Sequence, residues 1–374
     1  MANNSNKNKC NVPHLRFPEF CGEWETKSIN DLADVIGGGT PDTTVKSYWD
    51  GEIQWFTPSE IGKNKFVDAS LRTITEDGLN NSSAKLLPPN TILLSSRATI
   101  GECSLSLREC ATNQGFQSLV SKKCNIDFLY YLIQTKKKDL IRKSCGSTFL
   151  EISANEVRKI QVSVPSDVEQ QKIAELLSLI DKRIATQNKI IKKYESLIKG
   201  IAHKVAGMGK PNIRISECLE CTSSTLQESD VSEVGTYPVY GANGIVGYLN
   251  GYNTSDEAIY IIKDGSGVGS VSYVKGKCSA TGTLNILTAK QDYSLQFLYY
   301  ILKVFSFVPY KTGMAIPHIY FKDYGKAHIF CPSYSEQLKY AKFLSTIDDK
   351  LLVEQNILIN LSLQKQYLLH QMFI

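Results

Sequence analysis

The chain has 374 residues, 42% of them hydrophobic, and is therefore long enough for two domains with separate cores. Its formal net charge of +5 at pH 7 is mildly basic, which permits a polyanionic partner without requiring one. The polar segment 1–11 does not resemble a signal peptide, and no run of 18 apolar residues predicts a membrane span.

The first half of the chain predicts a mixed α/β domain. A segment rich in Gly, Thr, Tyr and Asn contains the apolar run 91–94, which predicts a buried strand. A helix is expected at about 127–143 and a short strand at 160–164, directly before Pro165.

A long helix is expected after Pro165, where the spacing of apolar residues changes from two to about 3.5. Ser166 and Glu169 have the spacing of a capping box, and Gly207 permits a left-handed end before Pro211. A helix of about 40 residues, with a rise of 1.5 Å per residue, is roughly 60 Å long.

The second half repeats this order. Strands are expected at 259–262 and 328–330, a helix at about 294–307, and a second long helix from the capping box of Ser333 and Glu336 to the end of the chain. The same residue types recur 167 positions later, as in Gly146 and Gly313, Ile152 and Ile319, Pro165 and Pro332, Glu169 and Glu336, and Asp181 and Asp348. A repeat of this length implies two whole domains.

Both long helices carry an apolar seam with heptad spacing, which is typical of a helix that pairs with another helix. The seam residues are Ile173, Leu177, Ile180, Ile184, Gln187 and Ile191 in the first helix, and Leu344, Ile347, Leu351, Glu354, Leu358 and Leu361 in the second. We expect the helices to pair antiparallel, with Gln187 and Glu354 hydrogen-bonded near the middle. Two ordinary core helices are the alternative.

The expected fold is therefore α+β. It has two similar mixed α/β domains, 14–165 and 211–332, separated by two long antiparallel coiled-coil helices, 166–207 and 333–374, with a pseudo-two-fold relation. Because duplex DNA also has a local two-fold, such a protein is suited to reading two half-sites, which differ here because the domains differ.

The motifs resemble those of the specificity subunits of type I restriction–modification systems over almost the whole length. The similar segments are Leu15-Arg16-Phe17-Pro18-Glu19-Phe20, Gly37-Gly38-Gly39-Thr40-Pro41, Gly51-Glu52-Ile53-Gln54-Trp55, Tyr237-Pro238-Val239-Tyr240-Gly241, and the duplicated Glu-Gln and Ile-Asp pairs. The chain departs from the family's frequent Arg-Gly at Arg97-Ala98, and its second long helix runs to Ile374 without a trailing segment.

The resemblance implies a DNA-binding subunit with two target-recognition domains that reads a bipartite, asymmetric sequence in double-stranded DNA. It also implies two modification (methyltransferase) subunits, which methylate adenine, and restriction (motor nuclease) subunits, which cleave DNA with ATP. The specificity subunit itself would be non-catalytic.

The residues themselves predict no catalytic site, metal or cofactor. Gly265, Gly267 and Gly269 precede a strand-like segment rather than the helix of a phosphate-binding loop, and the five histidines lack metal-ligand spacing. The ten cysteines are scattered, and Cys218 and Cys221 have no second pair to complete a zinc site. Scattered cysteines are typical of reduced thiols in the cytoplasm.

Side chains that can contact phosphates or base edges are expected in loops and at helix ends. In the first domain they are Lys63, Asn64, Lys65, Ser96, Arg97, Asn113, Gln114, Lys138 and Arg142. In the second they are Tyr240, Asn243, Lys263, Ser266, Lys311 and Lys322. The basic cluster around Lys138 is equally consistent with a favourable helix C-terminus, and Asn243 with a turn. Phe128-Leu129-Tyr130-Tyr131 is more typical of a core than of a base-stacking surface.

Two other functions remain open. A coiled-coil adaptor or ligand-binding protein unrelated to DNA would have similar helices, and an enzyme with an unrecognised site would have its own activity. DNA affinity, unlike most ligand affinities, falls steeply as salt rises.

Overall fold

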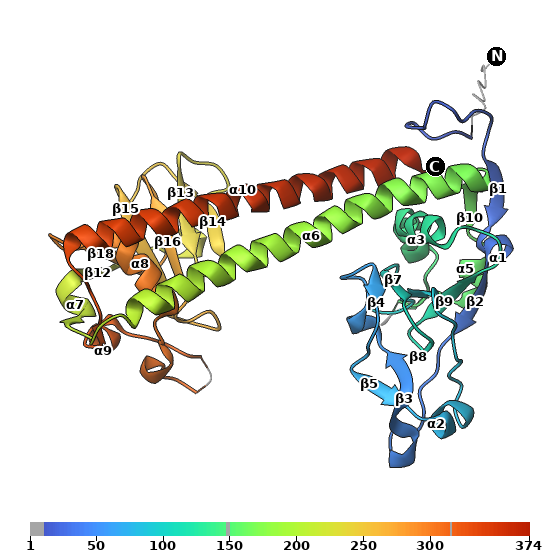
Figure 1. The fold of residues 1–374 in the computed structure, drawn as a ribbon, viewed down its shortest axis with the longest axis horizontal. Coiled ribbons are helices and arrows are strands. Elements are labelled where there is room, and N and C mark those ends of the chain that lie inside the picture. Colours follow the sequence, from blue (N-terminus) through green and yellow to red (C-terminus); the bar gives the residue numbers. More distant parts are fainter. Residues whose placement is uncertain (1–10, 147–149, 315) are drawn as a thin grey trace. The chain divides into compact units, whose positions relative to one another are not determined.

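The computed structural model describes residues 11–146, 150–314 and 316–374, so the polar segment 1–10 lies outside the described residues. The chain forms two compact units, Met1–Thr186 with Leu358–Ile374, and Gln187–Ile357. Both boundaries fall within long helices, α6 (Asp167–Ala206) and α10 (Tyr334–Met372), drawn in green and red in Figure 1. Of the helices in these described ranges, none is long and apolar enough to span a bilayer.

The first unit is a mixed α/β domain. Its elements are β1 (Glu25–Ser28), α1 (Ile29–Leu32), β2 (Ala33–Gly37), β3 (Trp49–Phe56), β4 (Phe66–Val67), β5 (Arg72–Ile74), α2 (Glu76–Asn80), β6 (Ile92–Leu94), β7 (Cys103–Ser106), β8 (Cys110–Thr112), β9 (Gln117–Ser121), α3 (Ile126–Thr135), α4 (Lys137–Arg142), α5 (Ala154–Arg158) and β10 (Gln161–Val164). Its described strands pair in the orders β2-β9-β6-β7-β4, β5-β3-β8 and β1-β10.

The second unit contains a shorter set. Its elements are β11 (Ile213–Arg214), α7 (Ile215–Cys218), β12 (Leu219–Ser223), β13 (Tyr237–Gly241), β14 (Gly244–Leu249), β15 (Glu257–Ile262), β16 (Val271–Lys275), β17 (Ser279–Ala280), β18 (Leu284–Ala289), α8 (Leu295–Val304), α9 (Phe321–Tyr324) and β19 (His328–Ile329). Its described strands pair in the orders β12-β18-β15-β16, β14-β13-β17 and β11-β19.

The two units share one topology. The order β2-β9-β6-β7 corresponds strand by strand to β12-β18-β15-β16, and β5-β3-β8 corresponds to β14-β13-β17. In both three-stranded sheets the middle strand pairs antiparallel with one neighbour and parallel with the other. The internal repeat in the sequence is thus a repeat of complete domains.

One predicted helix is divided in the structure. The segment expected as a single helix at 127–143 forms α3 and α4, because Lys136 between them has φ −92° and ψ 7°, outside helical geometry. On α3, Phe128, Leu129 and Tyr131 are fully buried, and Tyr130 is nearly so. The interpretation of this aromatic run as core is confirmed.

The seam residues predicted on α6 and α10 are all buried or half-buried. In the first unit, Ile173 and Leu177 of α6 share a core with Met372 of α10. In the second, Ile198 of α6 is clustered with Leu344 and Ile347 of α10. Residue numbers rise along α6 while they fall along α10, so the helix segments within each unit are antiparallel (Figure 1).

The predicted polar contact in the seam is present in the second unit. Gln187 Nε2 donates to the Glu354 carbonyl oxygen at 3.0 Å and also to the Glu354 carboxylate. A buried amide thereby finds an acceptor between apolar layers, which favours one register of the two helices.

The two predicted capping boxes have different outcomes. At the start of α10, Ser333 N donates to Glu336 Oε2 at 3.1 Å, which is the predicted glutamate half of the box. The Ser333 hydroxyl donates to the same oxygen at 2.5 Å rather than accepting from an early amide. At the start of α6 the box prediction is wrong. The Glu169 carboxylate is buried, and it binds Arg16 Nε at 2.7 Å and Arg16 Nη2 at 2.8 Å. A buried carboxylate takes the stronger, charge-assisted partner.

Candidate nucleic-acid interface

In the first unit, three loops meet where β6 ends. Ser96 N donates to Gly115 O at 2.8 Å, and Ile152 N donates to Ser96 O at 3.1 Å. Cys145 and Glu151 exchange two backbone hydrogen bonds, both at 2.9 Å. We call this meeting of residues 95–102, 113–115, 145–146 and 150–152 the domain-1 junction.

The second unit repeats these four backbone hydrogen bonds. Lys263 N donates to Thr283 O at 3.0 Å, and Ile319 N donates to Lys263 O at 2.9 Å. Thr312 and His318 exchange backbone hydrogen bonds of 2.9 and 2.7 Å. We call residues 262–270, 281–283, 312–314 and 316–319 the domain-2 junction.

Backbone torsion angles follow the same repeat. Ala98 has a φ of 55°, and Gly265, at the equivalent position, has a φ of 93°. Gly146 and Gly313 are also both left-handed, with φ of 130° and 90°. Alanine rarely adopts this conformation, so the surrounding bonds must hold the turn at Ala98 in place. Both domains therefore keep one backbone frame whatever side chains it carries.

The domain-1 junction brings together four residues predicted from the sequence: Ser96, Arg97, Asn113 and Gln114. Ser96 is fully buried, and its hydroxyl makes no hydrogen bond to the described part of the chain, so it is not presented to a ligand. Asn113 Oδ1 accepts from Gly115 N at 2.9 Å, which shapes the turn. Gln114 is exposed and hydrogen-bonded to Thr40.

Arg97 is half-exposed and pairs with Glu151, with Nη2 and Oε1 separated by 2.9 Å. Sequence patterns alone do not single out Glu151, its counterpart His318, or the Asp264 that binds His318. The offset of 167 residues that relates Ile152 to Ile319 also relates these positions, and would have been the signal to find them.

The basic end of α4 directly precedes part of the domain-1 junction in the sequence. Lys138 and Arg142 are exposed on α4, and Arg142 Nη2 is 2.8 Å from Asp139 Oδ1. Lys137, one residue earlier, pairs with Glu102 of the junction. The exposed charges of Lys138 and Arg142 are available to phosphates, and they also suit the negative end of the helix dipole.

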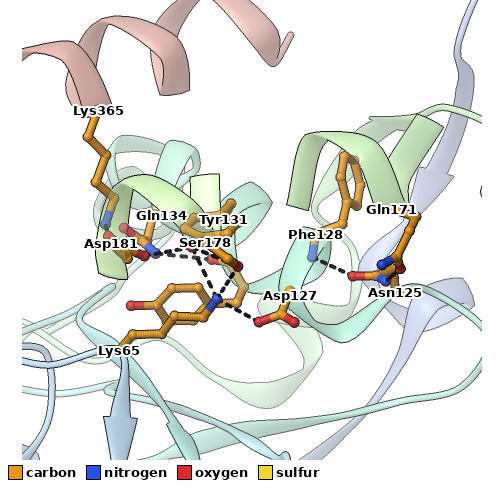
Figure 2. A network of polar contacts seen from close by, with 11 residues as sticks. Lys65, Asn125, Asp127, Phe128, Tyr131, Gln134, Gln171, Ser178, Asp181 and Lys365 are labelled. Atoms are coloured by element: carbon orange, nitrogen blue, oxygen red, sulfur yellow. Dashed lines mark hydrogen bonds and ion pairs between the residues drawn. The ribbon is translucent and has the colours of Figure 1, made fainter. Parts of the chain in front are cut away.

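Lys63, Asn64 and Lys65 do not share one environment. Lys63 and Asn64 are exposed, whereas the Lys65 side chain is only 9% exposed. Its Nζ lies 2.6 Å from Asp127 Oδ1, 2.8 Å from Ser178 Oγ and 3.1 Å from Tyr131 Oη (Figure 2). The structure therefore gives Lys65 internal partners on α3 and α6.

The same network continues into both long helices (Figure 2). Tyr131 Oη donates to Asp181 Oδ2 at 2.6 Å, and Asp181 Oδ1 is 2.7 Å from Lys365 Nζ on α10. Burial and this acceptor raise the pKa of Tyr131, so the phenol remains a donor. The mixed α/β domain of the first unit is thereby fastened to its helix pair. Among the described residues of the second unit, the Tyr300–Asp348 bond of 2.6 Å corresponds to it.

The predicted residues of the second unit are spread more widely. Lys263 and Ser266 belong to the domain-2 junction, and exposed Lys311 precedes it directly. Tyr240 is half-buried on β13 with its ring centroid 5.9 Å from that of Tyr260, and Asn243 is exposed in the β13–β14 turn. Lys322 is exposed on α9, with its Nζ 5.3 Å from the Tyr320 ring centroid.

Burial works against metal binding by Cys218 and Cys221. Burial raises the pKa of Cys218 to about 12 and of Cys221 to about 11, which keeps both as thiols rather than thiolate ligands. Within residues 11–146, 150–314 and 316–374, no group of three or more His, Cys, Asp or Glu could hold a metal ion.

The family model described as the type I restriction modification DNA specificity domain matches twice, at residues 22–196 and 212–363. The chain belongs to this family. Its two copies of the domain correspond to the two similar units, and the predicted fold class and the resemblance are both confirmed.

Individual relatives agree. A specificity subunit of the type I restriction enzyme MjaIX from Methanocaldococcus jannaschii is 38% identical over 46% of this chain and 41% of its own length. The EcoR124I/EcoR124II specificity subunit from Escherichia coli is 31% identical over 45% of this chain. The chain thus spans less than half the length of these two relatives, at 41% and 43%.

Relatives that match over most of this chain have lower sequence identity. The EcoprrI specificity subunit of Escherichia coli is 24% identical over 87% of this chain and 88% of its own. The crystal structure of the S subunit of a type I restriction-modification system from M. genitalium aligns with a TM-score of 0.63 at 19% identity, over 97% of this chain and 99% of that one. At this low identity, the structural similarity shows a shared fold.

Proposed function

We propose that the chain is a sequence-specific DNA-binding specificity subunit of a type I restriction–modification complex. The observation that carries the proposal is the duplicated junction, in which one backbone frame presents different exposed polar side chains in two family domains. A constant frame with variable side chains is what a protein needs to read two different short sequences.

The candidate DNA contacts follow from the solvent exposure of the side chains. We propose that Lys63, Lys138, Arg142, Lys311 and Lys322 meet phosphates, because they are basic side chains at the surface or at helix ends. Asn64, Arg97, Asn113, Gln114, Tyr240, Asn243, Lys263 and Ser266 are the candidates near base edges. Lys65 is left out of the contact set, since its ammonium group already has three internal partners.

The domain limits remain part of the proposal. Residues 14–165 and 211–332 would each read one half of a bipartite, asymmetric target, and 166–207 and 333–374 would form the spacer helices. The shared sheet order of the two units supports equivalent roles for the two domains.

The proposed partners are two modification subunits, which would methylate adenine, and restriction subunits, which would cleave DNA with ATP. This chain would be non-catalytic and would act in the cytoplasm. Exposed apolar side chains on the long helices support protein partners, because such residues cluster where another surface covers them. They include Leu179 and Leu197 on α6, and Phe343, Leu352, Val353, Ile359, Leu363 and Tyr367 on α10.

Genome-wide methylation mapping tests the proposal. Cells that carry this chain together with its modification subunit should methylate adenines in one bipartite, non-palindromic motif, and cells with the modification subunit alone should not. Replacing 14–165 with the same domain of a relative should change one half of the motif only. A methylation pattern indifferent to that exchange would refute the proposal.

Salt dependence separates this function from that of an adaptor unrelated to DNA. Affinity for duplex DNA should fall steeply between 50 and 200 mM salt, by about 10³-fold or more for six or more phosphate contacts. An adaptor that binds a neutral ligand would show little change.

A further inference from the structure

The two junctions carry polar side-chain pairs at equivalent positions, with the carboxylate on the opposite partner in each. Arg97 and Asp264 are 167 residues apart, as are Glu151 and His318. In the first junction, Arg97 Nη2 is 2.9 Å from Glu151 Oε1, and in the second, His318 Nδ1 is 2.7 Å from Asp264 Oδ1. The basic side chain at position 97 is thus replaced by an acidic one at 264, and the acidic side chain at 151 by an imidazole at 318.

The backbone around both pairs is the same. Each pair joins the turn after the buried strand to the loop that follows, through the isolated bridges Arg97–Glu151 and Asp264–His318. Each loop residue also bridges to a second position, Cys145 or Thr312. Because these bonds involve main-chain atoms, the frame does not depend on the side chains at 97, 151, 264 or 318.

Both pairs are open to solvent. Side-chain exposure is 43% and 38% for Arg97 and Glu151, and 36% and 35% for Asp264 and His318. An ion pair that is this exposed adds little to stability. Each side chain also keeps unused hydrogen-bonding groups, since the guanidinium has five donors and a carboxylate accepts several bonds. A partner can therefore bind them without breaking the fold.

We infer that these two pairs determine base specificity, one pair for each half of the DNA target. This inference rests on the proposed function and assigns it to four residues. Arginine donates in a fork that matches guanine O6 and N7, whereas aspartate accepts from the cytosine amino group. Glu151 and His318 orient the reading side chain and offer a group of the other polarity beside it. The reversed pairs read unlike bases, which makes the two half-sites differ.

Neighbouring residues fit the same role. Leu150 beside Glu151, and Ile316 near His318, are exposed apolar side chains. Apolar groups in the major groove contact the thymine methyl. The exposed cation Lys311 next to Thr312 in the second unit, and Lys138 and Arg142 in the first, supply charges for the flanking phosphates.

The test exchanges the pairs. The full chain with Arg97→Asp and Glu151→His, and separately with Asp264→Arg and His318→Glu, is expressed with its modification subunit, and methylated sites are mapped genome-wide. We expect the first variant to change one or two adjacent base pairs in one half-site and the second to change the other half-site only. Preference for the original base should fall about tenfold or more.

A matched control uses an exposed pair outside both junctions. Arg108 Nη2 lies 2.7 Å from Asp68 Oδ1, and both side chains are about half exposed. Exchanging them as Arg108→Asp with Asp68→Arg should leave both half-sites unchanged.

The outcomes separate this inference from the proposed function. If the unaltered chain directs no bipartite methylation, the proposed function fails. If it does, and the exchanged pairs keep both half-sites, the inference fails while the function stands. An exchanged chain that stays folded but methylates all sequences equally weakly also overturns it, because the pairs would then bind phosphates.

Conservative variants decide the case in which an exchange prevents folding. Arg97→Lys keeps the charge and loses the fork, and Asp264→Asn keeps the shape and loses the charge. Each should relax one position of one half-site at nearly full methylation of the original motif. Unchanged motifs in both conservative variants would overturn the inference.

Discussion

Replacing Lys65 with methionine distinguishes an internal role from a DNA contact. Methionine keeps the unbranched stem that packs beside the Tyr131 ring, where Nζ lies 4.6 Å from the centroid, but it removes the charge. The variant therefore deletes the ion pair with Asp127 and the bonds to Ser178 and Tyr131, with little change in volume.

The expected cost follows from the exposure of each partner. A hydrogen bond to a charged group contributes about 1.5–3 kcal/mol when it is protected from water. Asp127 is 38% exposed and can be rehydrated, and Tyr131 retains its bond to Asp181, so the loss lies near the lower end, at about 1.5 kcal/mol. For a unit of roughly 200 residues this lowers its Tm by about 3–6 °C.

Thermal unfolding and DNA titration are measured in parallel, with Lys63→Met as the control. Lys63 is exposed, so its replacement should change stability by less than about 0.5 kcal/mol. If Lys63 meets a phosphate, its loss reduces the slope of log affinity against log salt by about one, and loss of Lys65 leaves the slope unchanged. A Lys65 variant as stable as the Lys63 variant, with a reduced salt slope, would refute this reasoning.

Three further predictions concern the helices. Gln187→Leu with Glu354→Leu should raise the free energy of unfolding in urea by about 1 kcal/mol. It should also allow other registers of the two helices, which disulfide trapping detects. No change in stability or in register would count against the register role. Lys365→Ala should cost about 2–3 kcal/mol, because it leaves the carboxylate of Asp181 without its cation at side-chain exposures of 19% and 16%. Lys365→Ile with Asp181→Asn should recover most of this loss, because the amide carries no charge and still accepts from Tyr131. Equal losses in both variants would contradict this. Hydrogen bonds from Ser333 hold the pKa of Glu336 below its ordinary 4.5. This carboxylate therefore stabilises α10 above pH 4.5, and its contribution is lost as pH falls through the lowered pKa. Glu336→Gln should remove this part of the acid dependence in unfolding curves, and an unaltered acid profile would argue against it.

Local sequence patterns were sufficient to predict the two long helices and the two-domain organisation of this protein. The heptad spacing after Pro165 and Pro332 predicted both long helices, and the offset of 167 residues predicted two equivalent domains. The Gln187–Glu354 contact could also be predicted, because a helical repeat of known rise places each residue along its axis. Such features depend on neighbours close in sequence and on regular geometry.

Tertiary structure alone decided which polar residues face inward. Lys63 and Lys65 look equivalent in sequence, but only Lys65 lies against the carboxylate of Asp127, which comes from a helix more than sixty positions later. Likewise Glu169 leaves its capping box because Arg16 reaches it across the fold. The pairing of Arg97 with Glu151, and of Asp264 with His318, depends on loops brought together by backbone bonds between distant strands and turns. Charge partners chosen by the folded chain cannot be read from local spacing, because electrostatic attraction acts through space rather than along the sequence.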